Sequence, residues 1–124
     1  MKRILVIDDE ENIREIYIRI LVEEGFLVRQ ASDAKRAFNL MIREPMDLIL
    51  LDIKMPEING TTMMEVIKEF DPQLKVIVTS VYPVERQREM IPGALNYHDK
   101  SQGLGSLLMK INEALVVSNI SFSK

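Results

Sequence analysis

Short continuous runs of apolar residues alternate along this chain with segments whose apolar residues recur every three or four positions. Continuous runs predict strands buried on both faces of a sheet, and the wider spacing predicts amphipathic helices. The expected strands are Ile4–Ile7, Leu27–Ala31, Leu48–Leu51, Val76–Thr79 and Asn96–His98. A helical segment follows each of them, so the pattern predicts an α/β fold, a doubly wound five-stranded parallel sheet covered by five helices.

Polar residues, glycine and proline set the expected ends of the helices. Ser32 or Asp33 is expected to cap the second helix, Thr61 or Thr62 to open the third, and a short fourth helix to follow Pro83. Apolar residues at helical spacing are expected to face the core. In the first helix they are Ile13, Ile16, Tyr17, Ile20 and Leu21, and in the second Ala34, Ala37, Phe38, Met41 and Ile42. In the third helix they are Met63, Val66, Ile67 and Phe70, and in the last Leu104, Leu107, Leu108, Ile111 and Leu115.

Length and composition narrow the class of protein. The 124 residues suit a single domain, 1–124, with a core of about 2–117 and a frayed tail at 118–124. A net charge of −3 without a basic stripe argues against direct nucleic-acid binding, and the lack of cysteine excludes disulfides and zinc–thiolate sites. No apolar run suits a secretory signal or a membrane span, so we expect a cytoplasmic protein with no membrane contact. His98, the only histidine, is expected on an edge strand rather than in a metal site.

Reactive side chains follow four of the expected strands. Asp8 and Asp9 follow the first, Asp52 the third, Ser80 the fourth and Lys100 the fifth. In a doubly wound sheet the carboxyl ends of the strands lie at one rim, where ligands bind. A polar cap at a strand end explains any one of these residues but explains the set poorly.

The chemistry of this set points to a metal and a phosphoryl group. Clustered carboxylates raise one another's pKa unless a cation lies among them, and oxygen ligands favour Mg²⁺. An aspartate can itself act as a nucleophile and form an acyl phosphate. Phosphoryl transfer depends mainly on positioning and charge neutralisation, which a divalent ion, a lysine and a hydroxyl group supply.

Four segments, VIDDEE, LLDIKMPEING, VIVTSVY and GALNYHDK, resemble in order and spacing the signature segments of the response-regulator receiver domain. The resemblance is to the single-domain chemotaxis or sporulation type and covers about Lys2 to Val117. It implies a flavodoxin-like sheet with strand order 2-1-3-4-5. It also implies a regulatory phosphoacceptor rather than an enzyme, with at most weak self-phosphorylation and self-dephosphorylation.

The resemblance assigns the acids to phosphorylation and metal binding. Asp52 would be the phosphoacceptor and a metal ligand. Asp9 would bind Mg²⁺ directly and Asp8 through water, the backbone carbonyl of Lys54 would complete the protein ligands, and Mn²⁺ could substitute.

It assigns the remaining residues to the response. Ser80 would bind a phosphoryl oxygen and move, Lys100 would pair with the phosphate, and Tyr97 would swing inward behind Ser80. The donor would be a histidine kinase or a histidine phosphotransfer protein, and the target would bind the fourth helix, fifth strand and fifth helix. Val81 and Tyr82 lie beside the site, and a valine that narrows access gives the hypothesis of slow self-dephosphorylation.

The chain departs from the family pattern after Lys100. Ser101 stands where the family usually has proline, so a trans peptide bond is expected there and a less rigidly placed lysine. Gly103 and Gly105 at the helix start should each cost about 0.5–1 kcal/mol, with Ser101 as the expected cap. Lys100 lies 20 residues after Ser80, a shorter spacing than is usual, which indicates a short fourth helix and a modified output surface.

Three alternatives remain. A docking module that works without phosphorylation would keep the fold, but it would not need the acids. A phosphohydrolase with an aspartate nucleophile would want a second acid where Lys54 stands. A flavin-binding protein would need a phosphate-binding loop where the chain has DDEEN.

Overall fold

A single parallel sheet forms the centre of the molecule. The computed structural model describes the backbone of residues 1–53 and 60–120, and side chains up to residue 115. The strands are β1 (Arg3–Ile7), β2 (Leu27–Ala31), β3 (Leu48–Asp52), β4 (Lys75–Ser80) and β5 (Asn96–Asp99). They lie in the order β2-β1-β3-β4-β5, and all neighbouring pairs are parallel. The expected fold class and strand order are confirmed.

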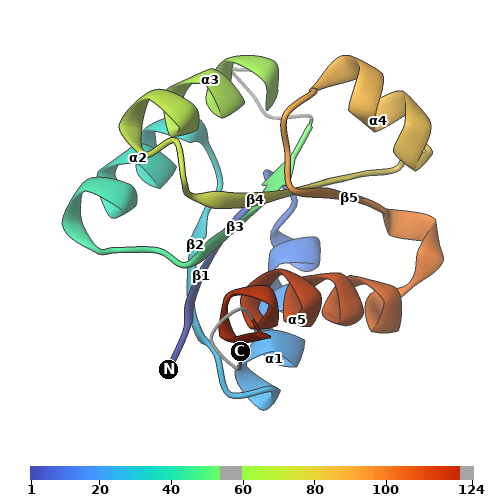
Figure 1. Ribbon diagram of the computed structural model, residues 1–124, viewed down its shortest axis with the longest axis horizontal. Helices are drawn as coiled ribbons and strands as arrows, with labels where there is room; N and C mark the ends of the chain where they lie inside the picture. Colours follow the sequence, from blue (N-terminus) through green and yellow to red (C-terminus); the bar gives the residue numbers. More distant parts are fainter. Residues whose placement is uncertain (54–59, 121–124) are drawn as a thin grey trace.

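Helices cover both faces of this sheet (Figure 1). They are α1 (Glu11–Glu23), α2 (Ala34–Arg43), α3 (Gly60–Phe70), α4 (Val84–Met90) and α5 (Leu104–Ile120), with a 3-10 turn, η1 (Lys100–Gln102), before α5. α1 and α5 pack on one face, and α2, α3 and α4 lie on the other (Figure 1).

β3 is buried on both faces, as its continuous apolar run predicts. Leu48 and Leu50 belong to the cluster under α1 and α5, whereas Ile49 and Leu51 belong to the cluster under α2 and α3. Burying such a side chain stabilises the fold by about 1.5–3 kcal/mol. β3 is therefore a firmly held support for its last residue, Asp52.

The helices bury fewer of their apolar residues than the sequence predicts. Tyr17, Ala37, Met63 and Ile111 are buried as expected, but Ile16 is 42% exposed and Ile42 is 56% exposed. Phe38, Phe70 and Leu104 are also exposed, against expectation. The two phenylalanines cover each other partly in an edge-to-face contact, with ring centroids 5.9 Å apart. Each helix buries only the residues that point straight at the sheet.

Asp33, rather than Ser32, caps α2, because its carboxylate accepts a hydrogen bond from the Arg36 amide at 2.9 Å. α3 begins at Gly60, one residue before the expected Thr61. The expected short fourth helix is confirmed, since α4 has seven residues.

In the connection from β5 to α5, Ser101 does not have the role of helix cap that the sequence predicts. The Lys100–Ser101 peptide bond is trans, as expected. Ser101 does not cap α5 but lies in η1, where its amide and hydroxyl both donate to the Asp99 carboxylate, at 2.8 and 2.7 Å.

Gly103 lies outside α5, so the helix cost expected for it does not apply. Its φ of 87° and ψ of 168° belong to a region that only glycine adopts readily. The backbone of residues 118–120, expected in the tail, is helical and continues α5.

Candidate functional site

The carboxyl ends of four strands bring the expected polar residues to one rim of the sheet. Asp8 follows β1, Asp52 ends β3, Ser80 ends β4, and Lys100 follows β5. Asp52 and Ser80 line a cavity of about 240 Å³ together with Asp9, Glu10, Val81 and Lys100. The cavity is large enough for a metal ion with its waters and a phosphoryl group.

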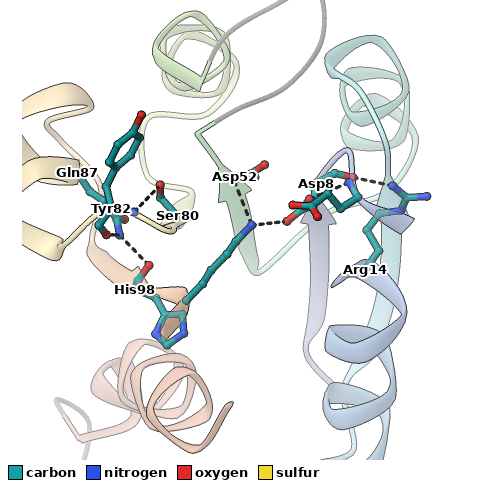
Figure 2. Close-up of polar contacts among 9 residues, drawn as sticks. Asp8, Arg14, Asp52, Ser80, Tyr82, Gln87 and His98 are labelled. Carbon is teal, nitrogen blue, oxygen red and sulfur yellow. Dashed lines mark hydrogen bonds and ion pairs between the residues drawn. The ribbon is translucent and has the colours of Figure 1, made fainter. Parts of the chain in front are cut away.

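Lys100 connects the two buried acids of the rim. Its Nζ lies 3.1 Å from Asp8 Oδ2 and 3.4 Å from Asp52 Oδ1. The lysine side chain is 13% exposed, and both aspartates are buried and lie at the ends of neighbouring strands (Figure 2). The lysine therefore reaches the carboxylates although Ser101 follows it in place of proline.

The surroundings of Asp52 make its ionised form less stable than that of an ordinary aspartate. Burial, and then the charge of Asp8, raise the pKa of Asp52 to about 6, although Lys100 opposes the shift. Burial lowers the pKa of Lys100, but the attraction of Asp52 and Asp8 outweighs it and leaves that pKa raised. One lysine thus neutralises the acids only in part.

Three consecutive acids after β1 form a group suited to a hard cation. Ligand oxygens of Asp8, Asp9 and Glu10 lie within 4.8 Å of one another, and Asp8 is buried whereas the other two are exposed. Donors that are all oxygen, on an open and partly solvated rim, fit Mg²⁺ with retained waters. Sequence analysis gave Glu10 no role, although it directly follows the two assigned acids. The Lys54 carbonyl lies outside the described residues.

Arg14, which sequence analysis did not single out, supports this acidic loop. Its Nη1 donates to the backbone carbonyl of Asp8 at 2.7 Å (Figure 2). Its Nε donates to Gln30 Oε1 at 2.9 Å. The Asp8 carboxylate in turn accepts from the Glu10 amide at 2.9 Å. Nothing in the local sequence marks an arginine one turn into a helix as a loop support.

Ser80 is buried, and its hydroxyl is turned toward the loop that follows β4. Its Oγ accepts a hydrogen bond from the Tyr82 amide at 3.1 Å and points away from Asp52 (Figure 2). Val81 is 69% exposed and borders the same cavity. Val81 and Tyr82 thus lie beside the site, where the sequence places them.

Tyr97 is buried in the cluster that lies under α3 and α4. Its hydroxyl donates to the Ile91 carbonyl at 2.6 Å and accepts from the Ala94 amide at 3.3 Å. The Arg88 guanidinium lies 5.0 Å from the ring centroid. The inward position is therefore the one that the structure describes, and movement of the ring stays a prediction.

His98 lies on β5, an edge strand of the sheet, as expected. It is buried, and burial followed by the charge of Lys110 lowers its pKa to about 4. A buried neutral imidazole at this position is part of the core rather than part of the acidic rim. Among the described residues, no helix is both long and apolar enough to cross a membrane.

Known proteins resemble this chain in amino-acid sequence and in fold. Residues 4–112 match the profile of the family described as "Response regulator receiver domain". Sporulation initiation phosphotransferase F of Bacillus subtilis is 29% identical over 106 residues, which are 86% of this chain and 77% of the relative. A putative NtrX-like response regulator of Rickettsia bellii is 31% identical over 121 residues, 94% of this chain, and the chain spans only 25% of its length.

Solved structures agree with this match. The response regulator TrrA of Thermotoga maritima, crystallised with Mg²⁺ and BeF, is 35% identical and superposes with a TM-score of 0.85 over 93% of this chain and 100% of TrrA. TrrA in complex with the histidine kinase ThkA gives 34% identity and a TM-score of 0.82, over 93% of this chain and 99% of TrrA.

Proposed function

Because the chain belongs to the response regulator receiver domain family, we propose that it is phosphorylated on Asp52 and that Mg²⁺ supports this reaction. Receiver domains are the phosphoacceptors of two-component systems, and the chain is such a regulatory domain rather than a conventional enzyme. The identity of the acceptor residue, the metal ligands and the partners belong to the proposal.

The position of the Asp52 carboxylate carries the proposal. It ends the strand that is buried on both faces, it borders the cavity of the rim, and its Oδ1 lies 3.4 Å from Lys100 Nζ. A carboxylate oxygen of Asp52 would attack the phosphorus atom, and the bond from phosphorus to the leaving group would break with its electron pair going to the leaving group. Lys100 is placed to pair afterwards with an oxygen of the phosphoryl group.

Asp9 and Asp52 are the proposed direct metal ligands and Asp8 a ligand through water, with Glu10 at the edge of the group. The raised pKa of Asp52 supports a cation here, because added positive charge would stabilise the ionised form that the reaction needs. When bound, Mg²⁺ would neutralise the charge that develops on the phosphoryl oxygens. The crystals of TrrA with Mg²⁺ and BeF support the choice of metal, and Mn²⁺ is the proposed substitute.

We propose a histidine kinase or a histidine phosphotransfer protein as the phosphoryl donor. The complex of TrrA with the histidine kinase ThkA supports a partner of this class. The proposed output surface is α4, β5 and α5, which connects to the site through Ser80 and the residues after it.

Intact-mass analysis after incubation with acetyl phosphate tests the proposal. We expect the mass of one phosphoryl group in the presence of Mg²⁺, little without it, and none in Asp52→Asn. Glu15→Gln, which removes an exposed acid of α1, is the matched control and should be phosphorylated like the wild type. Failure of the wild type to gain mass would favour the docking module that works without phosphorylation.

A further inference from the structure

Gln87 is the buried residue of the short helix α4, and it is fully buried. Placing an uncharged amide in the interior costs free energy unless it is hydrogen-bonded. An apolar side chain of similar size would fill this space without that cost, so the hydrogen bonds of the amide must compensate for its burial.

Both hydrogens of the Gln87 amide nitrogen are used. Nε2 donates to the backbone carbonyl of Tyr82 at 2.8 Å and to the backbone carbonyl of His98 at 2.8 Å. Two carbonyl acceptors require the NH₂ group at this end, which fixes the orientation of the amide. Gln87 Oε1 is buried and accepts no hydrogen bond from the described residues. The polar contacts of the side chain are thus its two donor bonds.

These two hydrogen bonds join the loop that follows β4 to the strand β5. Tyr82 lies two residues past the end of β4, in the loop beside the phosphorylation site, whereas His98 lies within β5. The Tyr82 amide also donates to Ser80 Oγ at 3.1 Å. A continuous path therefore runs from the Ser80 hydroxyl through Tyr82 and the Gln87 amide to the backbone of β5 (Figure 2).

We propose that Gln87 is a positioning residue that holds Tyr82 in place, keeps the Ser80 hydroxyl turned away from Asp52, and transmits the displacement of Tyr82 to β5. The proposal rests on the proposed function of Asp52 and deepens it. For Ser80 Oγ to reach a phosphoryl oxygen on Asp52, it must leave the Tyr82 amide. The Gln87 amide resists that change, and it also carries the change to the His98 carbonyl when Tyr82 moves.

The construction of α4 makes this coupling effective. The helix has seven residues, and its far end is attached to α3 and to β5, since Thr61 Oγ1 donates to the Met90 carbonyl at 3.4 Å and Tyr97 donates to the Ile91 carbonyl. Gln87 is the residue of this helix that is buried, and its amide contacts both the loop after β4 and the strand β5. The proposal therefore places an adjustable link, formed by the Gln87 amide, between the loop after β4 and the strand β5.

The test uses Gln87→Met in the full chain, because methionine keeps the length of the side chain and removes both donors. Beryllofluoride with saturating Mg²⁺ serves as the phosphoryl mimic, and ¹H–¹⁵N spectra report on two amides. The Tyr82 amide reports its bond to Ser80, and the Asp99 amide shares its peptide unit with the His98 carbonyl.

In the wild type we expect beryllofluoride to shift both amide signals. In Gln87→Met we expect the Tyr82 signal still to shift, the shift at Asp99 to fall by at least half, and beryllofluoride to bind roughly three- to tenfold more tightly, the factor that one net hydrogen bond is worth. Glu89→Met, on the exposed side of α4, is the control with the same new side chain and should match the wild type. Gln87→Leu serves as the second variant if Gln87→Met does not fold.

The outcomes separate the two proposals. If the wild type fails to bind beryllofluoride, the proposed function of Asp52 fails, and the role of Gln87 fails with it. If the wild type binds but Gln87→Met shows unchanged affinity and an unchanged Asp99 shift, only the role of Gln87 is overturned. Weaker binding in the variant would also overturn it, because Gln87 would then support the Ser80 arrangement that phosphorylation needs.

Discussion

At the scale of single residues, the chemistry of the site follows from an imbalance of charge. Lys100 contacts two buried aspartates, and Asp9 and Glu10 add further negative charge at the surface. Burial raises the pKa of Asp52 to about 6, and the charge of Asp8 adds to that shift. The ionised form of Asp52, the proposed phosphoacceptor, is thus destabilised before a cation joins it.

This imbalance predicts that Asp52→Asn stabilises the metal-free protein at pH 7.5. The wild-type pKa is raised from 3.8 to about 6, so the contribution of Asp52 to stability is present below pH 3.8 and is lost as the pH rises through about 6. We therefore expect the free energy of unfolding of the variant to exceed that of the wild type by on the order of 2–3 kcal/mol at pH 7.5. The difference should shrink as the pH falls from 7 to 4.

Urea unfolding in the presence of EDTA measures this difference. A variant that is less stable than the wild type at pH 7.5, or a difference that grows as the pH falls, would contradict the stated electrostatics of Asp52. Asp71→Asn, at a turn outside the site, is the matched control for the loss of one carboxylate.

At the scale of elements, the site depends on how closely the start of α3 approaches the end of α4. A Cβ atom on Gly60 would lie 2.7 Å from Ile91 Cδ1 and 2.9 Å from the Ile53 carbonyl oxygen. Backbone on one side prevents relief by rotation of a side chain. Gly60 therefore sets the spacing between α3, the segment after Asp52 and the chain that leads to β5.

Gly60→Ala is expected to destabilise the protein by about 1–3 kcal/mol, the usual cost of overpacking. Gly105→Ala is its matched control, because it lies in the first turn of α5 and a Cβ there meets no atom within 4 Å. That change should stabilise the protein by roughly 0.5–1 kcal/mol through helix propensity. Thermal and urea unfolding of the two variants should give opposite signs, and equal effects would show that contact with Ile53 and Ile91 is unimportant.

Some features of the helices and strands follow from the sequence, and others depend on tertiary packing. The strand positions, the short α4 and the burial of Tyr17 and Met63 follow from local spacing. The exposure of Ile16 and Ile42 could not be predicted, because it depends on the angle at which each helix meets the sheet. The cap role of Ser101 was wrong, since the Asp99 carboxylate binds the serine and Gly103 begins the approach to α5.

At the scale of the whole molecule, two apolar clusters separated by the sheet hold the acidic rim in place. α1 and α5 cover one cluster, and α2, α3 and α4 cover the other, so the charged residues gather at the carboxyl ends of the strands. A ligand that binds this rim in the folded chain alone raises the global stability by mass action.

Mg²⁺ is accordingly expected to raise the free energy of unfolding by about 2.7 kcal/mol at a free concentration of 100 times its Kd. Urea unfolding with MgCl₂, against NaCl of equal ionic strength, measures this gain. Asp9→Asn should remove most of it while leaving metal-free stability nearly unchanged, because Asp9 is exposed. A gain that NaCl reproduces, or that Asp9→Asn retains in full, would show that Mg²⁺ acts by screening rather than at the proposed site.

The sequence by itself determined the alternation of strands and helices and the presence of Asp8, Asp9, Asp52, Ser80 and Lys100 at strand ends. These features follow from local periodicity, together with the general rule that parallel strands bring their carboxyl ends to one rim.

Only the tertiary structure decided which of these groups touch. It paired Lys100 with both Asp8 and Asp52, placed Gln87 between Tyr82 and His98, and brought Gly60 against Ile91. The Lys100 contacts join residues up to 92 positions apart along the chain. Such contacts arise from the packing of whole elements against one another, and no local pattern of residues records them.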